Sequence, residues 1–302
     1  MILNLLNHHL SIVITKKIYL KQPNMLFKIN ANLDYQILSN STLILNILAN
    51  KDRQQIIDEN LNVNAEVKFL EPFASQNRFF SVTCLEDTHV KISYEVLVDN
   101  KYKLYHFKQT KEFEIVNASN KILSFLNPSR YCQSDLMYQV SGEIFGAYEN
   151  DYDKVAAITD WIYNHVAYLS GSSNEHTTAI DVFHNKVGVC RDFAHLGITF
   201  CRALTIPARY FTCYAYQLNP QDFHACFEAY INGEWLLFDA TKLCPINGLI
   251  KIATGRDAAD VPVANLFGNV NLLKSEVFCE TKEKNFKPLY HDFVNKQGIS
   301  YS

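Results

Sequence analysis

An Asn-Gly pair between two apolar runs is the feature that most constrains the fold of this chain. Residues 225–230 and 235–241 flank Asn232-Gly233. A two-residue turn of this kind adopts positive φ at both positions and is the strongest short signal for a β-hairpin. The sequence therefore predicts two antiparallel strands whose register is fixed by the turn.

This register brings a histidine and a carboxylate to one face of the hairpin. Ile231 faces Glu234, and counting back along both strands places Cys226 opposite Asp239. His224 lies two residues before Cys226, so it shares that face and is a diagonal neighbour of Asp239, with Cα atoms roughly 7–8 Å apart. Their side chains can close that gap. A His–Asp pair is predicted, unless a β-bulge lies between the two residues.

A cysteine precedes the hairpin at the expected start of a helix. Apolar residues at spacings of three and four predict a helix over residues 190–204. Gly188 is expected to end a short helix at residues 178–185 and to let the chain turn. Cys190 then lies in the first helical turn, where unpaired N–H groups and the helix dipole stabilise a thiolate. The alternative is a buried, inert thiol, and we assign the other seven cysteines to the core or the surface without a role.

Cys190, His224 and Asp239 together have the makeup of a cysteine nucleophile, its base and the residue that orients the base. Taken singly, His224 could be a hydrogen-bonded core histidine, and Asp239 could cap the strand end at Thr241. The hairpin register and the upstream thiol favour catalysis for the three together. The sequence therefore predicts thiol-dependent acyl transfer, with no cofactor and no metal.

Composition limits the partners and the compartment. The net charge of −3 gives no electrostatic reason to bind nucleic acid or an anionic membrane, and no apolar stretch is long enough to span a bilayer. The eight cysteines form no CxxC pair, which argues against a structural zinc site and a disulfide-stapled secreted domain. Residues 1–17 lack the basic region and cleavage site of a signal peptide. We expect a cytoplasmic protein of undetermined oligomeric state, with residues 1–24 as a loose extension.

The chain is expected to divide at residue 120. Short alternating β-type runs with polar turns predict an antiparallel β-sandwich at residues 25–120. Helical patterns followed by strands predict an α+β domain at residues 121–302, beginning with a helix at 152–168 capped by Asn150 or Asp151. The expected strands are 26–38, 42–48, 63–69, 79–85, 89–98 and 102–113 in the first domain, and 208–218 and 249–253 beside the hairpin in the second.

Several separated motifs carry a family resemblance. They are LNPSRYCQSD (126–135), GVCRDFAHL (188–196), DFHACFEAYINGEW (222–235), LFDAT (237–241) and GRDAADVP (255–262). In this order they resemble the bacterial two-domain transglutaminase-like proteins, which are described as cysteine proteases. The resemblance covers residues 26–290. It implies a papain-like α+β core, a Cys–His–Asp triad at Cys190, His224 and Asp239, and a peptide or protein substrate.

Five further residues are candidates for substrate binding. Position 226 is usually aromatic in the resembled family, so Cys226 would remove a bulky wall beside the imidazole and alter substrate fit. Arg256 and Asp257 could contact substrate or pair with neighbouring charges in a loop. Arg191 could favour an anionic sulfur or form a surface pair with Asp192. Tyr168 could line the cleft or polarise an oxyanion bound by the Cys190 backbone N–H.

The same residues serve two reactions. Water as acceptor makes the chain a peptidase or amidase, whereas a lysine or polyamine makes it a transglutaminase. We expect hydrolysis, because the sequence shows no calcium site of the animal transglutaminase kind. A catalytically silent, peptide-binding scaffold is the alternative from another class, and the intact set of three residues argues against it.

Overall fold

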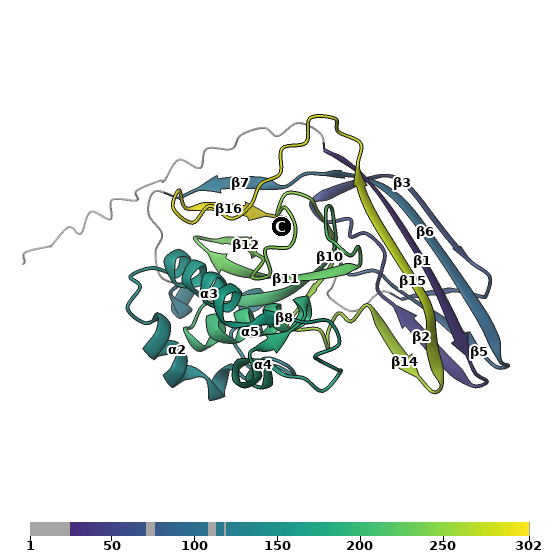
Figure 1. The fold of residues 1–302 in the computed structure, drawn as a ribbon, viewed down its shortest axis with the longest axis horizontal. Coiled ribbons are helices and arrows are strands. Elements are labelled where there is room, and N and C mark those ends of the chain that lie inside the picture. Colours follow the sequence, from purple (N-terminus) through teal and green to yellow (C-terminus); the bar gives the residue numbers. More distant parts are fainter. Residues whose placement is uncertain (1–24, 71–75, 108–112, 118, 302) are drawn as a thin grey trace, which may run out of the picture.

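The computed structural model describes residues 25–70, 76–107, 113–117 and 119–301. The described chain forms a β-sandwich that lies beside a unit of helices and strands, as Figure 1 shows. The α+β class with an N-terminal β domain is therefore confirmed. The extension expected at residues 1–24 lies outside the described residues. None of the described helices is long and apolar enough to cross a membrane.

The sandwich consists, in the described part of the chain, of two four-stranded antiparallel sheets, β15-β1-β6-β3 and β14-β2-β5-β4. Alternate residues of β1 and β2 are buried, as expected for strands with one face on a core. The strands are β1 (Leu26–Ile37), β2 (Ser41–Leu45), β3 (Gln54–Val63), β4 (Lys68–Leu70), β5 (Phe79–Cys84), β6 (Thr88–Asn100), β14 (Ala264–Phe267) and β15 (Val270–Thr281).

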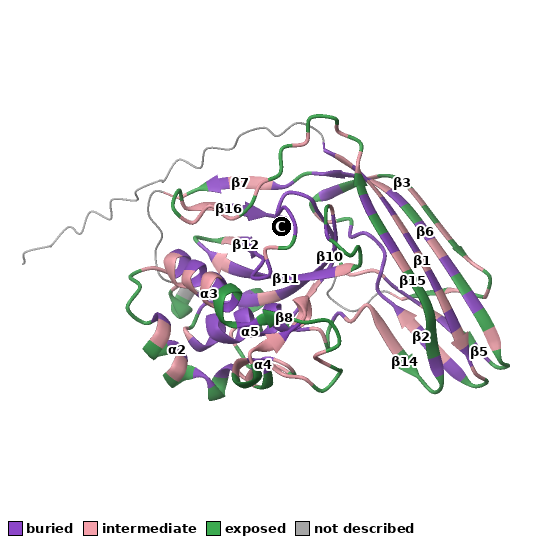
Figure 2. Cartoon of the chain, in the orientation of Figure 1, coloured by how far each residue is buried: buried purple, intermediate pink, exposed green. Residues whose placement is uncertain are grey.

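The second unit is built on a six-stranded antiparallel sheet, β13-β10-β11-β12-β16-β7, among the described residues. Helix α5 packs on β10 and β11, and Figure 2 shows these elements largely buried. The strands are β7 (Lys103–His106), β10 (Ala208–Ala215), β11 (Phe223–Ile231), β12 (Glu234–Phe238), β13 (Leu249–Gly255) and β16 (Gln297–Ser300). The helices are α1 (Asn120–Leu123), α2 (Tyr138–Phe145), α3 (Asp151–His165), α4 (Ala179–Asn185) and α5 (Cys190–Ala203), and β8 (Ala167–Tyr168) pairs with β9 (Val187–Gly188).

Two of the differences from the sequence prediction concern a strand and the domain boundary. A strand was expected at 63–69, but β3 ends at Val63 and β4 begins at Lys68. The boundary expected at residue 120 does not separate the two units. Strand β7 precedes it but belongs to the six-stranded sheet, and β14 and β15 follow it but belong to the sandwich. The second difference arises from strand pairing between distant segments, which a local polar–apolar pattern does not reveal.

The hairpin of β11 and β12 has the predicted turn and register. Asn232 and Gly233 have φ of 51° and 81°, and Ile231 pairs with Glu234. At the start of α3, the Asn150 side chain accepts a hydrogen bond from the backbone N–H of Asp153 at 3.0 Å, so the predicted cap is confirmed. These local signals position the two elements that border the site.

Candidate active site

The hairpin brings His224 and Asp239 into direct contact. Nε2 of His224 lies 3.0 Å from Oδ2 of Asp239, and both side chains are almost completely buried. The other carboxylate oxygen, Oδ1, accepts hydrogen bonds from the backbone N–H and the hydroxyl of Thr241, at 2.9 and 2.7 Å. The carboxylate is therefore held from two sides while it faces the imidazole.

The charge of the Asp239 carboxylate determines which ring nitrogen of His224 donates the hydrogen bond. Burial alone would raise the pKa of the Asp239 carboxyl, but the charge of His224 and hydrogen bonds from His224 and Thr241 hold that pKa below its usual value. Burial alone would lower the pKa of His224, but the Asp239 carboxylate has the larger effect and raises that pKa well above the usual value. An ionised carboxylate only accepts, so Nε2–H is the donor. The buried Nδ1 has no hydrogen-bond partner among the described residues.

Cys190 is the first residue of α5 and is partly exposed. The Asp192 carboxylate accepts the backbone N–H of Val189 at 2.9 Å, which fixes the start of the helix. Cys190 therefore lies where helix N–H groups and the dipole stabilise a thiolate. All eight cysteines lie in the described residues, and the other seven are buried.

Gly188 has a different role from the one predicted. Helix α4 ends at Asn185, and Lys186, with φ of 58°, makes the left-handed turn that was expected at Gly188. A Cβ on Gly188 would lie 2.8 Å from Cβ of Asp192, so glycine lets the chain pass close to the start of α5. The close approach sets the position of Cys190.

A cavity of about 520 Å³ lies beside Cys190 and His224. Cys190 and His224 both line it, together with Tyr131, Arg191 and Tyr210. The Tyr168 and Tyr210 phenols each interact electrostatically with both Cys190 and His224. Burial and the neighbouring Cys190 raise the pKa of Tyr168 to about 12, so its hydroxyl remains protonated and can donate a hydrogen bond at neutral pH.

Two of the five predicted binding residues lie at this site. Arg191 lines the cavity and donates to the Asp192 carboxylate, with Nη2 3.0 Å from Oδ1. Tyr168, on β8, is about half exposed and interacts with Cys190. The Arg191 guanidinium also holds the fully buried Asp192 carboxylate, which accepts the Val189 N–H, so this ion pair stabilises the start of α5.

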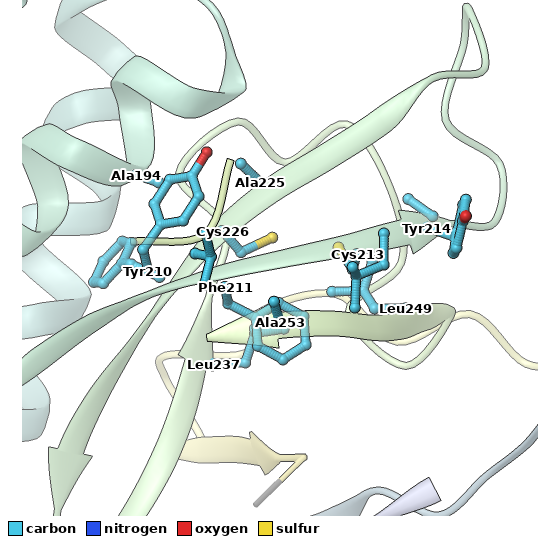
Figure 3. Close-up of a cluster of buried hydrophobic side chains, with 14 of the residues drawn as sticks. Ala194, Tyr210, Phe211, Cys213, Tyr214, Ala225, Cys226, Leu237, Leu249 and Ala253 are labelled. Carbon is cyan, nitrogen blue, oxygen red and sulfur yellow. The ribbon is translucent and has the colours of Figure 1, made fainter. Parts of the chain in front are cut away.

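Among the described residues, the other three do not line the cavity, and neither does Tyr168. Cys226 is buried, and its sulfur points toward that of Cys213 (Figure 3). Arg256 forms an ion pair with Asp260 at 2.9 Å. The buried Asp257 accepts the backbone N–H of Tyr131 at 2.9 Å. The Arg256–Asp260 ion pair is the local charge pairing given as the structural alternative for this loop.

Two residues at the His–Asp pair were missed by the sequence analysis. Nε2 of His291 accepts the backbone N–H of Asp239 at 2.8 Å, and the thiol of Cys244 lies 3.8 Å from Oδ2 of Asp239. Ligand atoms of His224, Asp239 and Cys244 lie within 4.8 Å of one another, so this set could hold a metal ion. No periodicity or motif marks His291, which belongs to an irregular segment far along the chain.

Two family models match the chain. The family described as the Transglutaminase-like superfamily matches residues 138–240, and the one described as Bacterial transglutaminase, N-terminal domain, matches residues 25–121. A solved structure of a "Putative Cysteine Protease" from Cytophaga hutchinsonii is 47% identical with a TM-score of 0.91, over 94% of this chain and 99% of that one. An uncharacterized protein of Mycobacterium leprae (strain TN), ML0607, is 26% identical over 182 residues, or 56% of this chain. The chain spans only 64% of that protein's length.

Proposed function

Because this chain is a thiol-dependent enzyme of the transglutaminase-like superfamily, we propose that it cleaves peptide amides through Cys190, His224 and Asp239. The observation that carries the proposal is the buried His224–Asp239 pair. Nδ1 of His224 has no hydrogen-bond partner among the described residues, and His224 lines the same cavity as Cys190. His195 also has a buried Nδ1 without a partner among the described residues, but it does not line this cavity, so the cavity shared with Cys190 distinguishes His224.

The chemistry begins with transfer of the Cys190 proton to Nδ1 of His224. Asp239 keeps the proton on Nε2 and stabilises the imidazolium that forms. The thiolate attacks the carbonyl carbon of an amide, and the Cys190 backbone N–H and the Tyr168 hydroxyl stabilise the oxyanion. The C–N bond then breaks as Nδ1–H protonates the departing amine, which leaves a thioester on Cys190.

Water then resolves the thioester. His224 Nδ1 removes a proton from water, the resulting hydroxide adds to the acyl carbon, and the thiol leaves with that proton. Hydrolysis is favoured over transfer to an amine because the 47%-identical solved structure is that of a "Putative Cysteine Protease". The substrates are then peptides or proteins. Transfer to a primary amine would use the same three residues and is the second candidate outcome.

Selective alkylation tests the proposed nucleophile. At about pH 6, where ordinary thiols are protonated, iodoacetamide should label one cysteine of the native protein, and peptide mass spectrometry should place the label on Cys190. Cys190→Ala should abolish labelling, whereas Cys84→Ala, which changes a buried thiol of the sandwich, should leave it intact. Labelling no faster than that of free cysteine would overturn the activation of this thiol.

A mixed peptide library with a labelled primary amine identifies the acceptor. Cleaved peptides indicate hydrolysis, and incorporated amine indicates transamidation. Both products should disappear in Cys190→Ala. If the wild-type protein yields neither product, the chain is the silent, peptide-binding scaffold rather than a working enzyme.

A further inference from the structure

Strand β14 has a free edge beside the cavity that contains Cys190. It is the terminal strand of its sheet and pairs with β2. No second strand pairs with it within residues 25–70, 76–107, 113–117 and 119–301. Figure 1 shows β14 as the strand of that sheet nearest to the helical unit. Val263, Ala264 and Asn265 line the same cavity as Cys190 and His224.

The register shows which backbone groups face outward. The backbone N–H of Asn46 donates to the carbonyl of Val263 at 2.9 Å, and Ala264 pairs with Leu45. In an antiparallel ladder, hydrogen-bonded and non-hydrogen-bonded pairs alternate. Ala264 and Leu266 are therefore the positions whose N–H and C=O point away from β2, toward the free edge.

The composition of β14 does not protect this edge against pairing. Terminal strands are commonly protected by charged side chains. In the three larger sheets of the described chain, the other terminal strands β3, β4, β7, β13 and β15 each contain at least one charged residue, whereas β14 contains none. Leu266 and Phe267 are instead about half exposed, at 49% and 55%. This edge can therefore accept an apolar, extended chain.

We propose that the free edge of β14 binds substrate, by pairing with an extended and apolar polypeptide segment that continues into the Cys190 cavity. This inference rests on the proposed peptidase function and specifies its substrate class as unfolded polypeptide. Main-chain hydrogen bonds to Ala264 and Leu266 supply affinity, and contacts with Leu266 and Phe267 favour apolar side chains. The sandwich thereby has a role in the reaction, because it supplies one wall of the cavity and the strand beyond it.

A proline on the edge tests the backbone contacts. Leu266→Pro removes an outward N–H without removing a bond to β2, and proline is tolerated on edge strands. Its matched control, Leu266→Ala, keeps the N–H and loses only the side chain. The probes are β-casein, an unfolded polypeptide, and p-nitrophenyl acetate, which reports on the thiol alone. We expect the ratio of casein to ester kcat/KM to fall at least tenfold in Leu266→Pro and less in Leu266→Ala. An unchanged ratio would overturn the proposal.

Hydrogen exchange of the otherwise unmodified edge gives a second readout that does not depend on how Leu266→Pro folds. β-casein added to Cys190→Ala should slow exchange of the Ala264 and Leu266 amides, read by NMR, and leave the terminal strand β4 unaffected. Cys190-dependent cleavage of casein without this protection would refute docking and leave the proposed function standing. Protection without any cleavage or labelling of the wild type would refute the function and leave docking standing.

Discussion

The imidazole of His291 accepts the backbone N–H of Asp239 at 2.8 Å, so a second histidine supports the carboxylate that faces His224. The His291 ring stacks on Phe238 and Phe293, with centroids 5.7 and 5.1 Å apart. Burial lowers the pKa of His291 to about 4. The ring is therefore neutral at pH 7, with Nε2 as its acceptor and the proton on Nδ1.

His291→Phe should impair both stability and turnover. Phenylalanine keeps the stacking but leaves the Asp239 N–H without a partner, which costs about 1–3 kcal/mol of unfolding free energy. The carboxylate then loses part of its support, so kcat should fall while iodoacetamide still reaches Cys190. His176→Phe, at an exposed position, is the control. Urea unfolding and peptide turnover measure the two effects, and wild-type values for both would remove His291 from the supporting role.

The same substitution should change how stability depends on pH. Since the folded pKa of His291 lies below the unfolded value of about 6.5, its neutral form stabilises the protein above pH 6.5. That contribution, on the order of 3 kcal/mol, is lost as the pH falls from 6.5 to 4. The wild type should therefore lose more stability than His291→Phe over this range, and the two curves of unfolding free energy should converge. Parallel curves would show that His291 is not buried as a neutral acceptor.

Asp239→Asn should lower turnover by roughly 10²–10⁴-fold with the fold intact. The amide oxygen can still accept from Thr241, but its NH₂ group would face Nε2 of His224 and favour the tautomer with the proton on Nδ1. The nitrogen that should accept the Cys190 proton is then blocked. Asp160→Asn, which changes a surface partner of Lys242, is the control. Steady-state kinetics with circular dichroism provide the measurement, and unchanged kcat would exclude Asp239 from the triad.

Tyr168→Phe tests whether the Tyr168 hydroxyl donates to the oxyanion or the side chain only contacts substrate. If the hydroxyl donates to the developing oxyanion, its loss should lower kcat by about 10²–10³-fold with little change in KM. Tyr163→Phe, on the exposed face of α3, should have no effect. A change in KM alone would assign Tyr168 to substrate contact instead, because a contact that is equally strong in the ground state and the transition state changes KM and leaves kcat unchanged.

Local chemistry explains which parts of the site could be predicted from sequence. The turn at Asn232-Gly233 fixes the register, and the register alone places His224 beside Asp239. The helix beginning at Cys190 follows from apolar spacing. In contrast, His291 contacts Asp239 through an irregular segment, and β14 returns to a sheet formed by strands near the start of the chain. Such contacts depend on how distant segments pack, for which a single sequence contains no short-range signal.

Gly188 and Gly142 form a matched pair for a last prediction about the position of Cys190. An added Cβ at Gly188 would lie 2.8 Å from Cβ of Asp192, whereas nothing lies within 4 Å of one at Gly142 in α2. Gly188→Ala should therefore displace the start of α5, cost about 1–3 kcal/mol of unfolding free energy, and slow the labelling of Cys190. Gly142→Ala should leave labelling unchanged and stabilise the helix by about 0.5–1 kcal/mol. Equal labelling rates in both variants would mean that the close approach of Gly188 does not position the thiol.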